Sequence, residues 1–261
     1  MKRLWTARID GKLKEYLYNF FKSTYFPHSL AVSLKKGGEL MKRETLYNIP
    51  IPYESSVEEL IKTLSSKDMK DFSLACEALS YKDDHKAYEA MKSYINDKDK
   101  YRRLYILKTI FRHPDSIELV DFLESAITSE DSMFVENGLF VIYEHQVKVS
   151  ESLLISAVNK HLHGLYTAVG SLITLDISEE NYREIVRIFT KSRECAQKEV
   201  IGKVLLQNYL PSKSKELFEL FRCNEFGKVR LFAASIAKEY NYDLSPFLFD
   251  KDGHVRKFAN L

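Results

Sequence analysis

One pattern returns seven times between Phe72 and Val255, and it constrains the fold of this chain more than any other feature. Each copy centres on an anchor residue, which is apolar in six of the seven copies. The anchors are Phe72, Tyr101, Phe134, Leu165, Lys198, Val229 and Val255. They are 29, 33, 31, 33, 31 and 26 residues apart. This spacing predicts an array of repeated structural units.

Two further columns flank the anchors. The residue four places before the anchor is acidic in five copies, and the residue four places after it is small in most. The first column contains Asp68, Asp97, Glu130, His161, Glu194, Glu225 and Lys251. The second contains Cys76, Tyr105, Gly138, Val169, Gly202, Ala233 and Ala259. A carboxylate is favourable in the first turn of a helix, where backbone N–H groups are unpaired. We therefore expect each anchor on a helix that begins near the acid, with the small residue allowing a neighbouring helix to approach.

Residues 54–261 are accordingly expected to form about six helix pairs, each with a first helix and an antiparallel second helix. The chain has only 9 Gly and 6 Pro, which favours long helices with short connections. The expected pairs are 56–66 with 68–81, 83–95 with 97–112, 115–129 with 130–146, 150–161 with 162–175, 179–191 with 194–210, and 212–223 with 225–241. Pro114, Pro211 and Pro246 fall at the starts of first helices, where a missing N–H costs little.

Residues 1–53 do not fit the repeat and are expected to form a separate N-terminal segment. The pattern of residues 10–25 predicts an amphipathic helix, and Gly37-Gly38 suits a hairpin turn. The alternating Ile and Pro of residues 49–52 predict an extended connector. We favour a cap on the first repeat, because an array must cover its ends. The alternative is a basic, aromatic surface that contacts an anionic membrane.

Net charge is unevenly distributed along the chain. Residues 1–53 carry 10 Lys/Arg against 4 Asp/Glu, a net +6. Residues 54–190 carry 16 against 24, a net −8, and residues 191–261 carry 13 against 9, a net +4. This asymmetry either steers a charged partner or reflects ordinary solvated helix surface, which is the simpler interpretation.

Two segments near the C-terminus resemble HEAT-like repeats. These are Gly227-Lys-Val-Arg-Leu-Phe-Ala-Ala and Asp252-Gly-His-Val-Arg-Lys-Phe-Ala, and Tyr101-Arg102 is a weaker copy. The HEAT-like family places Val-Arg-x-x-Ala on the second helix of each pair. The period near 31 is similar to that of the short HEAT-like repeats common in prokaryotic proteins. The resemblance implies an all-α fold, a right-handed α-solenoid, in which second helices line the concave face.

Arg102, Arg230 and Arg256 each follow an anchor directly and therefore share one position in the expected repeat. The resemblance favours a structural ladder, in which each arginine pairs with an acid of its own or the next repeat. The alternative is a binding surface on the concave face, to which Lys198 and Lys228 would add basic charge. These five residues are the candidate binding residues.

No catalytic constellation is recognised, so the chain is not expected to be an enzyme. The HEAT-like DNA glycosylases for alkylated bases use tryptophans in a cleft, whereas the single Trp5 lies outside the repeats. A HEAT-like di-iron family uses His-Glu dipeptides, which this chain lacks. His161 and His163 offer two metal ligands without a third. The three cysteines have no metal-ligand spacing. We expect no metal and no cofactor.

The resulting expectation is a non-catalytic scaffold or adaptor that binds a protein partner on its concave face. The rival is a nucleic-acid binding or repair protein resembling the HEAT-like glycosylases, and a peripheral membrane adaptor comes third. No apolar run is long enough to span a membrane, and we expect a cytoplasmic protein. The last copy stops soon after Val255, so either it caps the array or the array continues beyond Leu261.

Overall fold

The computed structural model describes residues 44–161 and 166–261. The chain divides into two compact units, Met1–Leu46 and Tyr47–Leu261. The helix expected at residues 10–25 and the hairpin expected at residues 37–38 lie outside the described residues.

The described residues are mainly helical and contain almost no sheet, which confirms the all-α prediction. Two short strands, β1 (Thr45–Leu46) and β2 (Ile49–Pro50), form the two-stranded sheet. Tyr47 and Asn48 between them both have positive φ. Ile49 and Pro50 are extended, as the alternation of Ile and Pro predicted.

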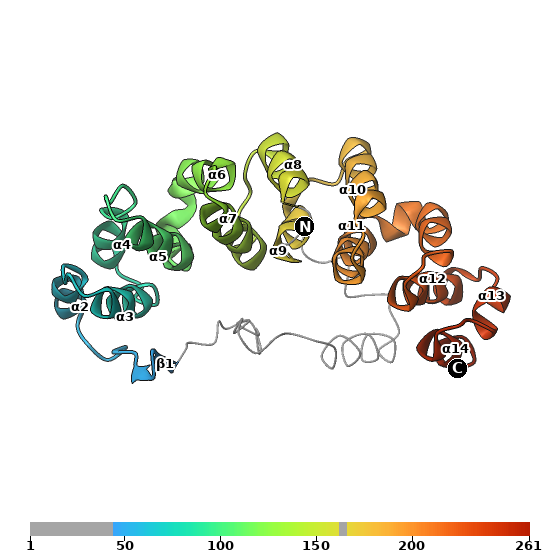
Figure 1. Ribbon diagram of the computed structural model, residues 1–261, viewed down its shortest axis with the longest axis horizontal. Helices are drawn as coiled ribbons and strands as arrows, with labels where there is room; N and C mark the ends of the chain where they lie inside the picture. Colours follow the sequence, from blue (N-terminus) through green and yellow to red (C-terminus); the bar gives the residue numbers. More distant parts are fainter. Residues whose placement is uncertain (1–43, 162–165) are drawn as a thin grey trace. The chain divides into compact units, whose positions relative to one another are not determined.

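The helices follow one another with short connections, and Figure 1 labels them along the chain. The first helices of the first five expected pairs are α2 (Val57–Leu64), α4 (His85–Lys92), α6 (Val120–Thr128), α8 (Glu151–Lys160) and α10 (Glu179–Lys191). The sixth expected first helix, 212–223, lies within α11, and a short further helix, α13 (Ser245–Leu248), precedes the last copy. The second helices are α3 (Met69–Leu79), α5 (Lys100–Ile110), α7 (Ser132–His145), α9 (Tyr166–Gly170), α11 (Cys195–Arg222), α12 (Gly227–Tyr240) and α14 (Gly253–Ala259). Two 3₁₀ helices, η1 (Pro114–Leu119) and η2 (Ser171–Thr174), precede α6 and follow α9.

One expected pair of helices meets at a kink, and one expected helix is shorter than predicted. The range of α11 contains two helices joined across a kink at Lys213, where the backbone angles are non-helical. The expected helices 194–210 and 212–223 correspond to the two parts, and Pro211, which lacks an N–H, lies close to the kink. The helix expected at 162–175 is described only from Tyr166, and it tightens into η2 after Gly170.

Aspartates cap many of the second helices. In two cases the cap lies one or two residues after the acid of the predicted column. Asp68 and Asp252 each accept a hydrogen bond from the backbone N–H two residues further on. In the second and third copies the caps are Asp99 and Asp131, so the column acids Asp97 and Glu130 precede the helix. The acids mark the helix starts, as expected, but several lie outside the first turn.

The helices pack mainly on their neighbours in sequence. Within pairs, α2 contacts α3, α6 contacts α7 and α10 contacts α11. Second helices also contact one another, in the order α3, α5, α7, α9, α11, α12 and α14. Second helices therefore carry most of the core, and eight of the eleven residues of α3 are buried. Burial on several sides explains why apolar residues recur on more than one face of α3.

Glycines allow two of these contacts to be close. A Cβ at Gly138 on α7 would lie 2.7 Å from Ile127 Cγ2 on α6. A Cβ at Gly202 on α11 would lie 2.7 Å from the ring of Phe232 on α12. The prediction that small residues after the anchor permit helix approach is confirmed for these two copies.

Of the six anchors in the described residues, all but one are buried, and the seventh, Leu165, lies outside those residues. Phe72, Val229 and Val255 are fully buried, and Phe134 is nearly so. Tyr101 is 54% exposed, because α5 begins at Lys100 and Tyr101 lies in its first turn. The third residue of α12 and of α14 is the anchor, and the third residue of α5 is Arg102. The predicted anchor in this copy is therefore one residue too early.

Candidate functional site

The arginines predicted as ladder or binding residues are engaged by the chain itself. Arg230 is the fourth residue of α12, and its guanidinium forms two hydrogen bonds with Asp250, at 2.7 Å each. Its third nitrogen, Nη1, donates to the carbonyl oxygens of Asn224 and Glu225 at 2.7 and 2.8 Å. Both side chains of the ion pair are 7% exposed. All of this places Arg230 inside the structure rather than on a free surface.

The same contact recurs at two other helix starts. Arg256 is the fourth residue of α14 and donates to the carbonyl oxygen of Asp250, six residues earlier. Arg103 is the fourth residue of α5 and donates to the carbonyl oxygen of Asp97, also six residues earlier. Arg103, not Arg102, is thus the counterpart of Arg230 and Arg256.

Arg102 makes a different contact. Its Nη2 donates to the carbonyl oxygen of Ser66, in the turn between α2 and α3. Its guanidinium lies 4.8 Å from the ring centre of Phe72 and 5.9 Å from that of Tyr94. This arginine therefore joins two successive helix pairs.

The two lysines among the candidate binding residues, Lys198 and Lys228, also have partners within the chain. Lys198 is 8% exposed, and its Nζ lies 4.9 Å from the ring centre of Phe189. Lys228 pairs with Glu199 at 2.9 Å, and the same carboxylate pairs with Lys203 at 2.9 Å. The five predicted residues do not converge on one site, and their contacts leave little positive charge for a phosphate.

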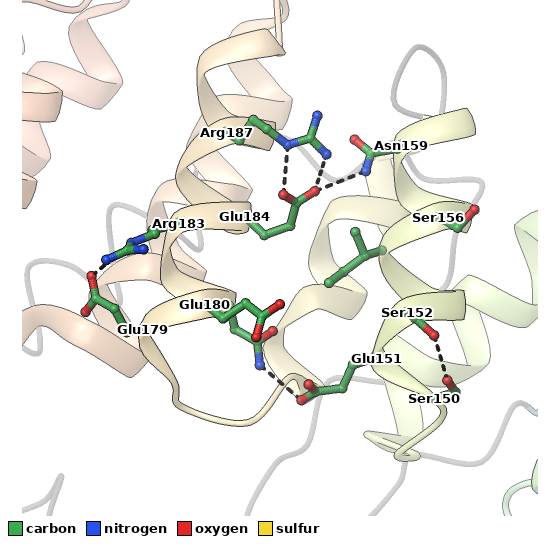
Figure 2. Close-up of a pocket in the computed structure, with 12 residues that line it drawn as sticks. Ser150, Glu151, Ser152, Ser156, Asn159, Glu179, Glu180, Arg183, Glu184 and Arg187 are labelled. Atoms are coloured by element: carbon green, nitrogen blue, oxygen red, sulfur yellow. Dashed lines mark hydrogen bonds and ion pairs between the residues drawn. The ribbon is translucent and has the colours of Figure 1, made fainter.

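An open groove lies between two first helices, α8 and α10 (Figure 2). It has a volume of about 1170 Å³. Its lining is polar except for Ile155. The lining residues are Ser150, Glu151, Ser152, Ile155, Ser156, Asn159, Glu179, Glu180, Asn181, Arg183, Glu184 and Arg187. We call this feature the α8–α10 groove.

Two hydrogen bonds cross the α8–α10 groove and hold its walls in place. Asn159 Nδ2 on α8 donates to Glu184 Oε1 on α10, at 3.3 Å. Asn181 Nδ2 on α10 donates to Glu151 Oε1 on α8, at 3.1 Å. Figure 2 shows the two crossings, with Ser152 and Ser156 along the α8 side. Each crossing uses one residue of each helix, so the spacing of the helices is set by side chains.

Most carboxylates of the groove are satisfied. Arg187 holds the pKa of Glu184 below its ordinary value through a paired hydrogen bond. Lys213 does the same for the pKa of Glu179, which also pairs with Arg183 at 3.4 Å. Glu151 additionally accepts from the backbone N–H of Asp176.

Glu180 differs from the other three glutamates. It is exposed, and it has no hydrogen-bond or ion-pair partner within residues 44–161 and 166–261. The lining contains four glutamates and two arginines, a net charge of −2. The groove therefore offers one unpaired carboxylate together with apolar surface and hydroxyl groups.

The sequence pattern does not predict the α8–α10 groove. Its residues come from two different repeats and have ordinary helix-surface character. The one available signal was the doubled acid at Glu179-Glu180, which also suits the first turn of a helix.

Two further features of the described residues concern metal binding and membrane insertion. Across the described ranges, no group of three or more His, Cys, Asp or Glu side chains could hold a metal ion. His161 ends α8, whereas His163 lies outside the described residues. Of the helices in those ranges, none combines the length and apolar character needed to cross a bilayer.

No protein-family model and no curated protein matches the chain. Its function is therefore inferred from the geometry of the helices and their side chains.

Proposed function

We propose that this protein is a non-catalytic interaction scaffold that binds a polypeptide partner in the α8–α10 groove. The observation that carries this proposal is an open groove whose helices are joined by side-chain hydrogen bonds across it. Such a groove keeps its shape without a ligand, so binding a chain segment in it costs little reorganisation. The hydroxyl, amide and carboxylate groups can serve the N–H and C=O groups of an extended backbone.

The proposal moves the binding surface away from the second helices. The sequence-based expectation placed it on their basic residues, along a concave face. Arg230 and Lys228 are paired with Asp250 and Glu199, so partner binding there would have to displace an internal ion pair. The α8–α10 groove requires no such displacement at Glu180.

We also propose that the helix pairs form a right-handed α-solenoid of short HEAT-like repeats. The serial contacts between successive second helices support this arrangement, because solenoid repeats touch mainly their neighbours. The fourth-residue arginine at Arg103, Arg230 and Arg256 supports a common repeat unit.

A groove-blocking variant tests the proposed function. Ser156 is exposed in the α8–α10 groove, and Ser156→Tyr would fill part of it. Ser125→Tyr on α6 is the matched control, because Ser125 is also exposed on a first helix and does not line this groove. Partners would be cross-linked to the full chain in cells of its native host and identified by mass spectrometry. We expect one set of proteins to be lost with Ser156→Tyr and kept with Ser125→Tyr. Recovery of the same set with all three chains would overturn the proposal.

A further inference from the structure

We propose that the α8–α10 groove binds an extended segment of a partner protein that places a Lys or Arg side chain beside Glu180. This inference rests on the proposed function and specifies its partner. Three observations support it: the unpaired carboxylate, the adjacent apolar surface, and the charge balance of the groove.

The carboxylates of the groove differ in what they can accept. Glu151, Glu179 and Glu184 already receive hydrogen bonds from groups of the chain. Glu180 alone among the lining glutamates has no such donor in the described part of the chain. A cation arriving in the groove therefore finds its best acceptor at Glu180.

The apolar part of the lining suits the rest of a basic side chain. Lys and Arg carry three or four methylene groups that pack on apolar surface while the charged end stays near water. Ile155 is half-buried in the lining and can take such a stem. Ser152 and Ser156 present hydroxyl groups along the same helix, α8 (Figure 2). An acidic side chain would instead meet a net charge of −2.

The net charge of the region around the groove also favours a basic partner. Residues 54–190, which include both helices, carry 24 acidic and 16 basic residues. This excess of negative charge raises the rate at which a basic segment encounters the groove. An RNA or DNA strand would be repelled by the same charges, so a polypeptide is the occupant that the groove fits.

Selection from random peptides tests the inference. Random 12-residue peptides displayed on phage would be selected on the full chain, and those that also bind Ser156→Tyr would be discarded. Enriched peptides would then be synthesised with a fluorescent label, and their affinities measured by anisotropy at about 50 mM salt. We expect a shared Lys or Arg whose replacement by Met weakens binding about threefold to fivefold, as for an exposed ion pair.

Glu180→Gln provides the decisive comparison. We expect it to weaken the same peptides about threefold to fivefold, with no further loss when the peptide Lys or Arg is also replaced. Glu136→Gln on α7 is the matched control, because Glu136 is exposed and also has no hydrogen-bond or ion-pair partner among the described residues, and it should leave affinity unchanged. Groove-dependent peptides that bind Glu180→Gln as tightly as the native chain would overturn this inference and leave the proposed function standing. If no enriched peptide depends on the groove, both are overturned.

Discussion

Arg230 uses its guanidinium to hold three parts of the chain together. Two nitrogens bind Asp250 in the loop before α14, and the third binds carbonyl oxygens in the loop before α12. Only the planar fork of arginine can make this set of contacts, since lysine offers one compact charge. Arg230, one of the five candidate binding residues, therefore has a structural role, in keeping with the ladder interpretation.

Removing this arginine should destabilise the fold strongly. Arg230→Ala leaves the Asp250 carboxylate buried without its partner, and breaking a buried ion pair typically costs about 3–5 kcal/mol. Urea unfolding followed by circular dichroism would measure the change in free energy. Arg222→Ala is the control, because Arg222 pairs with Glu219 at the surface, where such pairs contribute less than about 1 kcal/mol. Equal losses in the two variants would contradict the buried ladder.

The same pair predicts a pH dependence of stability. Arg230 holds the pKa of Asp250 below its ordinary value, so the native state binds this proton less readily than the unfolded state. The stabilisation is complete above the unfolded pKa of about 4 and is lost as pH falls through the lower native pKa. The stability difference between the native chain and Asp250→Asn should therefore shrink below about pH 4. Urea unfolding from pH 7 to pH 3 would measure it, and a constant difference would refute the pairing.

Residue-level prediction failed at Arg102 for a simple reason. Tyr101 is aromatic and precedes an arginine, so it resembles the apolar anchor of the other copies. The helix start is set instead by Asp99, whose side chain accepts from the Tyr101 N–H. A cap one or two residues away from its expected position shifts every assignment that follows in the helix.

At the scale of the element, helix starts and stops were largely predictable. The expected helix 68–81 corresponds to α3, and the expected helix 179–191 has the same limits as α10. Both begin at a capping side chain, Asp68 or Ser178, which local sequence reveals. The break inside α11 was also predictable, because Pro211 lacks the N–H of a continuous helix and the backbone is non-helical at Lys213.

Adding one methyl group at Gly138 tests how closely α6 and α7 approach each other. Gly138→Ala would place a Cβ against Ile127 Cγ2, which is buried and β-branched and so moves little. Overpacking costs about 1–3 kcal/mol, and the better helix propensity of alanine returns up to about 1 kcal/mol. We expect a net loss of about 1–2 kcal/mol in chemical unfolding.

Gly253→Ala is the matched control for that substitution. The nearest side-chain atom would be 3.7 Å away, at Arg256 Nη2, which is an ordinary contact. This variant should be neutral or more stable by up to about 1 kcal/mol, because alanine has fewer unfolded conformations. A loss at Gly253 as large as that at Gly138 would mean that packing is not the cause.

At the scale of the whole molecule, charge pairing predicts how the chain behaves toward nucleic acid. The C-terminal region carries a net +4, but Lys228 and Arg230 are held by Glu199 and Asp250. We expect no measurable binding of duplex DNA in anisotropy titrations at about 50 mM salt, where phosphate contacts are strongest.

If the chain does bind duplex DNA, one variant shows whether Lys228 is responsible. If DNA binds with salt-sensitive affinity and Lys228→Gln weakens it, the nucleic-acid alternative is supported over the proposed function. Lys228 suits this test better than Arg230, because Lys228 is only half-buried and its removal leaves Glu199 paired with Lys203.

The α8–α10 groove depends on how two repeats pack against each other, and this explains why the sequence did not reveal it. Asn159 and Glu184 are separated by 25 residues, and they meet only because α8 and α10 lie side by side. Periodicity predicts which face of each helix is exposed, but it does not predict the distance between exposed faces of different repeats.

The kink in α11 has a consequence for how the molecule responds to force. The range of α11 contacts α9, η2 and α10, which precede it in the sequence, and α12, which follows it. Pulling the chain from its C-terminus should release α14 and α12 first, and then the part of α11 that follows Lys213. Because the kink separates the two parts of α11, a stretching experiment on a single molecule should record their release as two small steps rather than one large one.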